Sequence, residues 1–446
     1  MIFSQIIIFL QKFFTMKRKI YSDLVAWKNK SNRLPLIVNG ARQVGKSYIL
    51  QKFAKQEFES YILVNLETDK ALVEKFEETI TPIPILQYLE SAHFQRIIPG
   101  KTLVILDEIQ SCERALTSLK YFCEQTPEYH IVAAGSLLGV AINRHKYSFP
   151  VGKVDEMTMF PMDFEEFLTA LNRENIADSI REHFESNAPL DIHSLALGYY
   201  NQYLIVGGMP AAVKEYIATG SFVAVADIQN RILKEYIADM AKYADNATGI
   251  KIRACYESIP AQLAKENHKF QYSVVQKGGS ATIFGEAMEW LKCAGIVLKC
   301  QKTTQGVMPI KVYVDLSDFK IYMSDVGMLV MQSGVVAQVI LSPLETNNYF
   351  LGAIAENYVA QSLVSNLIPL IYWKNDNTAE IDFVIQKGAM VIPIEVKSGF
   401  RVRSKSLNIF IEKYKCKYGI RISKKNFGFE NNIKSVPLYA TFCIEP

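Results

Sequence analysis

LIVNGARQVGKSY, residues 36–48, is the most informative part of this sequence. It matches G-x-x-x-x-G-K-[ST]: a short apolar run leads into a glycine loop, and the loop ends in Lys46 and Ser47. Glycines at both ends of the loop let the backbone turn sharply, so that several N–H groups face one anion. Lys46 adds a mobile positive charge for the outer phosphates, and the Ser47 hydroxyl is a ligand for Mg²⁺. The pattern predicts a site for ATP and Mg²⁺ at the beginning of a helix, whose positive dipole end faces the same anion.

We expect contacts with ATP from the loop and the first turn of this helix. These residues are Gly40, Ala41, Arg42, Gln43, Val44, Gly45, Lys46, Ser47 and Tyr48. A second apolar run, residues 102–106, ends in the acidic pair Asp107 and Glu108. Ligands of parallel sheets gather at the carboxyl ends of the strands, which suits an acidic pair at this position. We therefore expect Asp107 to hold Mg²⁺ together with Ser47, and Glu108 to act as general base on the attacking water.

Four stretches rich in apolar residues have the length of strands: residues 36–38, 61–66, 102–106 and 129–134; we expect a fifth strand at 154–160. Such runs are typical of strands buried on both faces of a parallel sheet in an α/β protein. Ser136 follows the fourth run, and we expect it to contact the γ-phosphate or the water; a cap for the next helix is the alternative. The candidate catalytic residues are thus Lys46, Glu108 and Ser136.

An extra strand between the phosphate loop and the acidic pair, with Glu108 beside Asp107, separates this sheet from GTPase-like P-loop proteins. The arrangement resembles the additional-strand (ASCE) branch of P-loop NTPases, which includes AAA-type ATPases. In that branch a neighbouring subunit often supplies an arginine that stabilises the transferred charge. The resemblance implies a homo-oligomer, with Arg114 and Arg144 as candidates for this arginine. An ordinary solvated arginine is the better interpretation at either position.

Composition and length limit the class of protein. The chain has 446 residues, enough for about three domains. Hydrophobic residues make up 49% and charged residues 21%, which allows a large core and excludes a wholly disordered chain. The seven cysteines form no C-x-x-C pair, so we predict neither a disulfide framework nor a zinc knuckle, and a reducing cytoplasm fits best.

The N-terminal apolar run, residues 2–14, is too short to cross a bilayer, so we expect no membrane span. Two interpretations of it stay open: an upstream extension before a true start at Met16, or a peripheral anchoring helix. Residues 17–30 have the spacing of an amphipathic helix.

Several longer motifs occur along the chain. They are GARQVGKS (40–47), LDEIQ (106–110), AGSLLG (134–139), FPVGKVDEMTMFPMDFEEFL (149–168), YLIVGGMPAAV (203–213), FKIYMSDVGML (319–329) and GAIAENYVAQ (352–361). Together they resemble one group of bacterial and archaeal AAA-type ATPases with a fused C-terminal domain of unknown function. The resemblance covers nearly the whole chain from Met16, and the later motifs are the more discriminating ones.

The resemblance and the element pattern together predict five segments. Their ranges are 1–30 for an N-terminal extension and amphipathic helix, 31–165 for the P-loop ATPase domain, 166–248 for a helical lid, 249–335 for a winged-helix-like domain and 336–446 for a restriction-endonuclease-like α/β domain.

The middle of the chain is mostly helical over residues 163–240, with a break at GGMP, residues 207–210. A lid hinge and a turn between packed helices both fit this break. Further on we expect paired helices at 259–269 and 280–293 and strands at 296–302 and 310–316, the order of a winged helix. The second of these helices carries Glu286 and Glu289 against Lys292 alone, and carboxylates oppose phosphate binding. We therefore favour a structural or partner-contact role for it over a place in the DNA groove.

Residues 379–398, AEIDFVIQKGAMVIPIEVKS, predict a β-hairpin with Asp382 on one strand and Glu395 and Lys397 near the end of the other. Residues two apart on a strand face the same side, so Glu395 and Lys397 project together and Asp382 can join them. Two carboxylates can hold Mg²⁺, and a lysine can orient or deprotonate an attacking water. The D…ExK pattern resembles the PD-(D/E)xK nuclease fold, and Glu356 matches a helix carboxylate often seen in that fold.

A basic stretch runs from Lys397 to Lys425. Between them lie Arg401, Arg403, Lys405, Lys413, Lys415, Lys417, Arg421 and Lys424, opposed only by Glu412. A solvated face is one interpretation; beside a phosphodiester-type site, a track for the DNA backbone is the better one.

From these patterns we expect a Mg²⁺-dependent ATPase that acts on or near DNA. Two alternatives stay open. One is an ATP-regulated, Mg²⁺-dependent DNA endonuclease that uses the tail residues. The other is a nucleotide-switched DNA- or protein-binding module with a silent nuclease fold.

Overall fold

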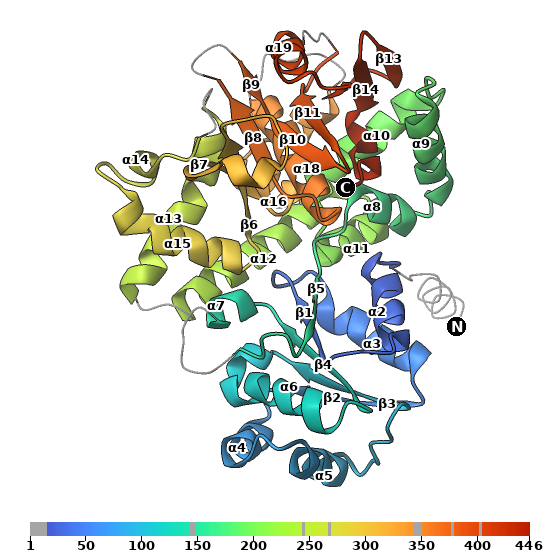
Figure 1. Ribbon diagram of the computed structural model, residues 1–446, viewed down its shortest axis with the longest axis vertical. Coiled ribbons are helices and arrows are strands. Elements are labelled where there is room, and N and C mark those ends of the chain that lie inside the picture. The colour runs from blue at the N-terminus through green and yellow to red at the C-terminus, as the bar shows by residue number, and fades with distance from the viewer. Residues whose placement is uncertain are drawn as a thin grey trace. The chain divides into compact units, whose positions relative to one another are not determined.

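The computed structural model describes residues 16–142, 149–242, 246–265, 269–342, 350–375, 379–400 and 404–446 (Figure 1). The N-terminal apolar run, Arg144, Arg401 and Arg403 lie outside these residues. The chain divides into two compact units. The first comprises residues 17–160 with 293–295, and the second comprises residues 161–292 and 296–446. The five predicted segments are finer than this division and stay predictions.

The first unit contains one parallel sheet of five strands, as predicted. Its strands are β1 (Leu36–Asn39), β2 (Ser60–Asn65), β3 (Thr102–Asp107), β4 (His130–Gly135) and β5 (Asp155–Thr158), in the order β2-β3-β4-β1-β5. β3 and β4 are buried at every position, which explains their unbroken apolar sequence. β4 lies between β1 and β3, so the strand that carries the phosphate loop is not paired with the strand that carries the acidic pair.

Six helices accompany the described part of this sheet. They are α2 (Ile20–Asn29), α3 (Lys46–Glu57), α4 (Lys70–Glu78), α5 (Pro82–His93), α6 (Glu113–Gln125) and α7 (Leu138–Ile142). Alternate strand residues such as Ile62, Val104 and Ile131 share a core cluster with Leu72 and Phe122 of α4 and α6. This follows from the period of two on a strand, which gives each face of the sheet its own set of apolar side chains.

The second unit begins with helices, as the sequence predicts. They are α8 (Phe164–Ala170), α9 (Glu174–Ser186), α10 (His193–Val206), α11 (Pro210–Thr219), α12 (Phe222–Lys242) and α13 (Asn246–Leu263). Gly207 ends α10 with a φ of 71°, and a Cβ there would lie 2.3 Å from Asp325 Oδ1. The Gly208 N–H donates to Asp325 Oδ2 at 2.6 Å. The break at residues 207–210 is therefore a closely packed turn between α10 and α11.

The next segment differs in part from the predicted winged helix. Its elements are α14 (Tyr272–Val275), α15 (Ala281–Cys293), β6 (Val297–Thr303), η2 (Ile310–Tyr313), β7 (Val314–Met323), α16 (Val326–Ser333) and α17 (Ala337–Leu341). The helix expected at 259–269 was wrong, because α13 continues through Pro260 and ends at Leu263. The strand expected at 310–316 begins only at Val314, after a short 3₁₀ turn.

The two strands of the expected wing do not stand alone. β6 pairs with β7 in antiparallel fashion and with β8 (Ile371–Lys374) in parallel, and β8 pairs with β9 (Glu380–Ile381). The result is a four-stranded sheet in the order β7-β6-β8-β9, built from segments that the sequence assigned to two different domains. An independent winged helix is thus not confirmed.

The rest of the tail forms a second sheet around the helix α18 (Phe350–Ser365), most of whose residues are buried. The elements are β10 (Phe383–Lys387), β11 (Met390–Val396), α19 (Lys405–Tyr414), β12 (Gly419–Ser423), β13 (Gly428–Glu430), β14 (Ile433–Pro437) and η3 (Leu438–Cys443), and the strand order is β10-β11-β12-β14-β13. β10 and β11 form the predicted antiparallel hairpin, with Lys387 opposite Met390. None of the helices in the described ranges is long and apolar enough to cross a membrane.

Candidate functional site

The glycine loop between β1 and α3 has the backbone that a phosphate loop needs. Gly40, Gln43 and Gly45 have φ angles of 147°, 69° and 96°. A Cβ at Gly40 would lie 2.2 Å from the carbonyl oxygen of Met159, so no larger residue fits there. Gly45 is the N-cap of α3 in the left-handed region, where glycine carries no steric penalty. Both glycines of the motif are therefore required by the local geometry.

Lys46 lies in the first turn of α3 and is only 8% exposed. Its Nζ donates to the carbonyl oxygens of Gly40 at 2.8 Å and Ala41 at 2.9 Å, so the ammonium is held against the loop. Burial lowers the pKa of Lys46 to about 8, although Glu108 and Asp107 act in the opposite direction. An anion in the loop would raise this pKa again, because it favours the charged form.

Ser47 and Asp107 are brought together from two elements. The Ser47 hydroxyl donates to Asp107 Oδ2 at 2.6 Å, and Asp107 is 7% exposed at the end of β3. Hydroxyl and carboxylate oxygens are the ligands that Mg²⁺ prefers, so this pair fits the predicted ion. Asp107 Oδ1 also accepts the N–H of Glu108 at 3.0 Å, which fixes the carboxylate.

Glu108 has a φ of 52°, an uncommon value for a residue other than glycine. Its Oε2 accepts hydrogen bonds from the amide of Gln110 and from the hydroxyl of Ser136, the latter at 3.4 Å. Ser136, from the end of β4, thus lies beside Glu108 as expected for a shared site. A Cβ at Gly135 would lie 2.6 Å from Gln110 Oε1, so the missing side chain at this position makes room for the amide.

The other residues predicted to contact ATP differ in their exposure to solvent. Ala41 and Val44 are buried, whereas Tyr48 is 51% exposed. Arg114 is engaged within its own unit, because its Nε donates to the carbonyl oxygen of Phe76 at 2.7 Å.

Sequence reasoning assigned no role to Gln110 or to Arg18. Arg18 is 8% exposed and donates to the carbonyl oxygen of Val44, inside the loop, at 2.8 Å. The only sequence signal for Gln110 was its place in LDEIQ, and Arg18 had none beyond a basic cluster before a helix.

In the tail, the structure brings together the four predicted residues Glu356, Asp382, Glu395 and Lys397. Lys397 Nζ lies 3.2 Å from Glu395 Oε1. Asp382 Oδ2 accepts the N–H of Val396 at 2.7 Å. Burial, followed by the charge of Glu356, raises the pKa of Asp382 to about 7. These carboxylates are close enough to influence one another.

Two further residues of this region were missed. Lys320 and Tyr322 come from β7, which precedes the predicted nuclease-like segment. Lys320 Nζ lies 3.0 Å from Glu356 Oε1, and the Tyr322 hydroxyl donates to the same oxygen. The available signal was a lysine within the apolar motif FKIYM, two residues before the tyrosine and hence on the same face of a strand.

The tail residues fit a divalent cation only in part. Glu395 Oε2 is buried and has no hydrogen-bond partner among the described residues, which leaves an oxygen open to a cation. Within the described ranges, however, no group of three or more His, Cys, Asp or Glu side chains is placed to hold a metal ion. A metal here would rest on Asp382 and Glu395, with other ligands from water or substrate.

The basic stretch is only partly available to a partner. Lys405, Lys415 and Lys417 are exposed. Lys413 lies over the ring of Trp373 at 5.3 Å, and Arg421 donates to the hydroxyls of Ser404 and Ser435.

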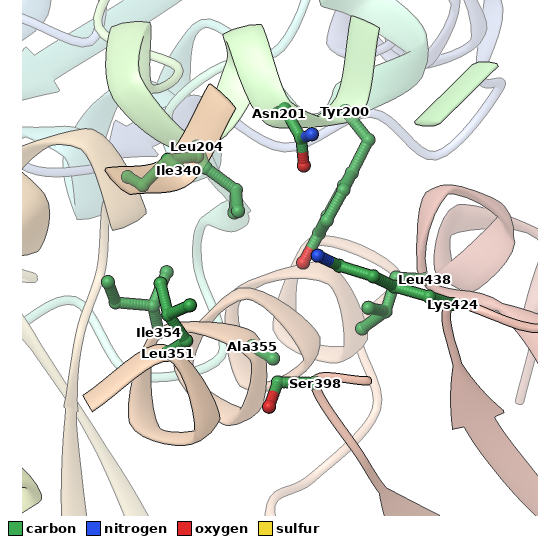
Figure 2. Close-up of a pocket in the computed structure, with 10 residues that line it drawn as sticks. All are labelled: Tyr200, Asn201, Leu204, Ile340, Leu351, Ile354, Ala355, Ser398, Lys424 and Leu438. Atoms are coloured by element: carbon green, nitrogen blue, oxygen red, sulfur yellow. The ribbon is translucent and has the colours of Figure 1, made fainter. Parts of the chain in front are cut away.

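A separate pocket lies in the second unit between α10, α18 and the segment around Lys424 (Figure 2). Its empty volume is about 310 Å³, including space open to solvent. Its polar side chains are those of Tyr200, Asn201, Ser398 and Lys424. In Figure 2, Tyr200 and Lys424 lie across the pocket from the aliphatic side chains of Leu351 and Ile354. The four predicted tail residues do not line this pocket.

The five-stranded parallel sheet, the glycine loop with its lysine, and the serine–aspartate pair define a P-loop NTPase fold. In agreement, residues 32–168 match the family model described as an AAA domain. Residues 197–338 match a domain of unknown function (DUF8612), and residues 351–441 match another (DUF4143). No curated protein matches the chain.

Among solved structures, the chain is similar to a Walker-type ATPase of Pyrococcus abyssi, with 15% identity and a TM-score of 0.45 over 71% of this chain and 96% of the other. It is also similar to the ORC2 protein of Aeropyrum pernix, with 12% identity and a TM-score of 0.35 over 76% of this chain and 94% of the other. Neither likeness bears on the function of this chain, because both TM-scores lie below 0.5.

Proposed function

We propose that the first unit binds ATP with Mg²⁺ and hydrolyses its terminal phosphate bond. The observation that carries this proposal is the 2.6 Å hydrogen bond between Ser47 and Asp107, next to a lysine held in the glycine loop. Lys46 stabilises charge on the outer phosphates, and Ser47 and Asp107 hold the metal ion. Glu108 accepts the proton of the attacking water, with its carboxylate oriented by Ser136.

The test compares ATP affinity in Lys46→Ala with that in Lys55→Ala. Both residues lie on α3, but Lys55 is exposed in the last turn and serves as the matched control. We expect Lys46→Ala to lose most of its ATP binding and Lys55→Ala to keep it. Unchanged affinity in Lys46→Ala would refute the site assignment.

Glu108→Gln separates binding from hydrolysis. It keeps the shape of the side chain but cannot accept a proton, so it should bind ATP and turn it over roughly 10²- to 10⁴-fold more slowly. Full turnover in Glu108→Gln would remove it as the general base.

A second candidate function concerns the tail. We infer that it is a Mg²⁺-dependent DNA nuclease site regulated by ATP, because Lys397, Glu395 and Asp382 converge beside exposed lysines. The experiment follows plasmid nicking with Mg²⁺, with and without ATP, in the unmodified chain, in Lys397→Ala and in Lys387→Ala. Lys387 is an exposed lysine of the same hairpin and is the control.

The outcomes distinguish three possibilities. Nicking lost only in Lys397→Ala supports the nuclease. If Lys397→Ala still nicks the plasmid, the activity belongs to another site or to a contaminant. Salt-dependent DNA binding without any nicking favours a nucleotide-switched binding module with a silent nuclease fold.

The proposal includes a homo-oligomer that supplies an arginine across subunits. It is supported by the match of residues 32–168 to the AAA domain model. Arg114 is a poor candidate for this arginine, because it already donates to the carbonyl oxygen of Phe76 within its own unit. Sedimentation velocity with and without ATP tests it: a monomer under both conditions would exclude an arginine supplied in trans.

A further inference from the structure

The pocket of Figure 2 is separate from both sites proposed above. Its described lining includes no residue of the phosphate loop and none of the four predicted tail residues. Its empty volume of about 310 Å³ lies at the lower end of the range for small-molecule sites, and part of that volume is open to solvent. The size of the pocket therefore suits a small molecule.

A buried hydroxyl in this pocket has no partner. Tyr200 is 1% exposed, and its hydroxyl makes no hydrogen bond with the described residues. In Figure 2 the Tyr200 side chain extends from α10 toward the middle of the pocket. A buried polar group without a partner costs free energy, and a bound acceptor would remove this cost. Burial also raises the pKa of Tyr200, so the hydroxyl stays protonated and can donate to such an acceptor.

Lys424 enters the pocket from a backbone that is held on both sides. Its N–H donates to the carbonyl oxygen of Gly399 at 3.3 Å, and its carbonyl oxygen accepts from His193 Nε2 at 3.0 Å. His193 is the first residue of α10, the helix that also carries Tyr200. One helix thus positions both the hydroxyl and the backbone from which the ammonium extends.

The described lining residues indicate the chemistry of the occupant. Lys424 carries the only charge among them and none is acidic, while Asn201 and Ser398 add hydrogen-bond donors to that of Tyr200. This set favours an anion, and a single ammonium matches one negative charge better than the nearly two charges of a phosphate monoester. The rest of the lining is aliphatic and consists of Leu204, Ile340, Leu351, Ile354, Ala355 and Leu438.

We propose that this pocket binds a small carboxylate that carries an aliphatic chain. The carboxylate accepts hydrogen bonds from the Tyr200 hydroxyl and the Lys424 ammonium, and the chain packs against the aliphatic side chains of the lining. The proposal depends neither on ATP hydrolysis nor on DNA cleavage, because the described lining shares no residue with those sites.

Titration of the intact chain with butyrate, hexanoate and octanoate, followed by saturation-transfer difference NMR, tests the proposal. Each additional buried methylene should tighten binding about fourfold until the pocket is full. Hexylamine and 1-hexanol are the controls, since they keep the apolar chain and lack the negative charge. We expect both to bind roughly tenfold more weakly than hexanoate, or weaker still. No saturable binding of any of the three carboxylates, or equal affinities for hexanoate and 1-hexanol, would overturn the proposal.

Two variants locate the binding. Tyr200→Phe removes only the hydroxyl, Lys424→Met removes the ammonium, and each should weaken hexanoate binding roughly tenfold. Lys425→Met is the matched control, because Lys425 is exposed and is not a lining residue. Unchanged hexanoate affinity in Tyr200→Phe and Lys424→Met would assign the binding to another surface and overturn the proposal. If Lys424→Met does not fold, Tyr200→Phe decides alone, since it deletes a group without a partner among the described residues.

Dimethyl phosphate distinguishes a carboxylate from the phosphodiester of a nucleic acid, because both carry one negative charge. Saturable binding of hexanoate but not of dimethyl phosphate supports the proposal. Binding of dimethyl phosphate that is lost in Tyr200→Phe, without binding of hexanoate, would overturn it in favour of a contact with a nucleic-acid backbone.

Discussion

Raising the pH should weaken nucleotide binding by an amount set by Lys46. Burial lowers the pKa of its ammonium to about 8, so it is largely charged at pH 7 and mostly neutral at pH 9. Only the charged form attracts the outer phosphates. With this pKa, affinity should fall roughly twofold between pH 7 and pH 8 and roughly tenfold by pH 9, or about 1.4 kcal/mol.

Calorimetric titration with ADP at pH 7, 8 and 9, without metal ion, measures this change. Repeating the titration in buffers with different ionisation heats counts the protons taken up, which should be about half a proton per ADP at pH 8. Adenosine is the control, because it lacks the phosphates that Lys46 would contact. Constant ADP affinity from pH 7 to pH 9, or an equal loss for adenosine, would refute the reasoning.

Two further predictions concern the first unit. Burial, and then the charge of Arg33, lowers the pKa of His130 from 6.5 to about 4. The folded state therefore favours neutral His130, whereas the unfolded state binds a proton on this residue already near pH 6.5. The contribution of neutral His130 to the free energy of unfolding is complete above pH 6.5 and is lost as the pH falls toward 4. We expect a loss of roughly 2 kcal/mol by pH 4.5 in urea unfolding, absent in His130→Phe; equal pH dependence in both would contradict it. Gly135→Ala should displace the Gln110 amide from Glu108, since its Cβ would lie 2.6 Å from Gln110 Oε1. In Gly135→Ala the turnover number should fall about tenfold while the ATP affinity stays the same. Gly198→Ala is the control and should change neither quantity, because a Cβ at Gly198 would meet no atom within 4 Å. An unchanged turnover number in Gly135→Ala would show that the Gln110 amide does not orient Glu108.

The sequence alone predicted the sheet of the first unit, because each of its signals is local. The apolar runs that became β3 and β4 are buried at every position, and this can be read from a few consecutive residues. Gly40 and Gly45 were predicted from the G-x-x-x-x-G-K-[ST] pattern, and their φ angles of 147° and 96° explain why this pattern needs glycine at both positions. A strand end also places a side chain at a known edge of a parallel sheet, so Ser47 and Asp107 could be expected together although they lie 60 residues apart.

Predictions from local sequence failed where tertiary packing decides the bounds of a helix or the pairing of a strand. A helix was predicted to begin at residue 259, but α13 runs through this position from Asn246. The pair β6 and β7 was predicted as an isolated wing, whereas β6 also pairs with β8 from the tail. Strand periodicity shows which face of a strand is buried, but it does not show which distant strand lies beside it.

The partners of buried charges were decided only in three dimensions. A lysine within an apolar strand implies that some counter-charge must lie nearby, because an unpaired buried ammonium is too costly. The sequence does not say which one: Lys320 meets Glu356 from a helix 36 residues away, together with Glu380 from another strand. Electrostatic attraction acts through space rather than along the chain. The partners of Lys320 therefore followed from the folding of β7, α18 and β9 around it, and not from the D…ExK pattern that first indicated a site in the tail.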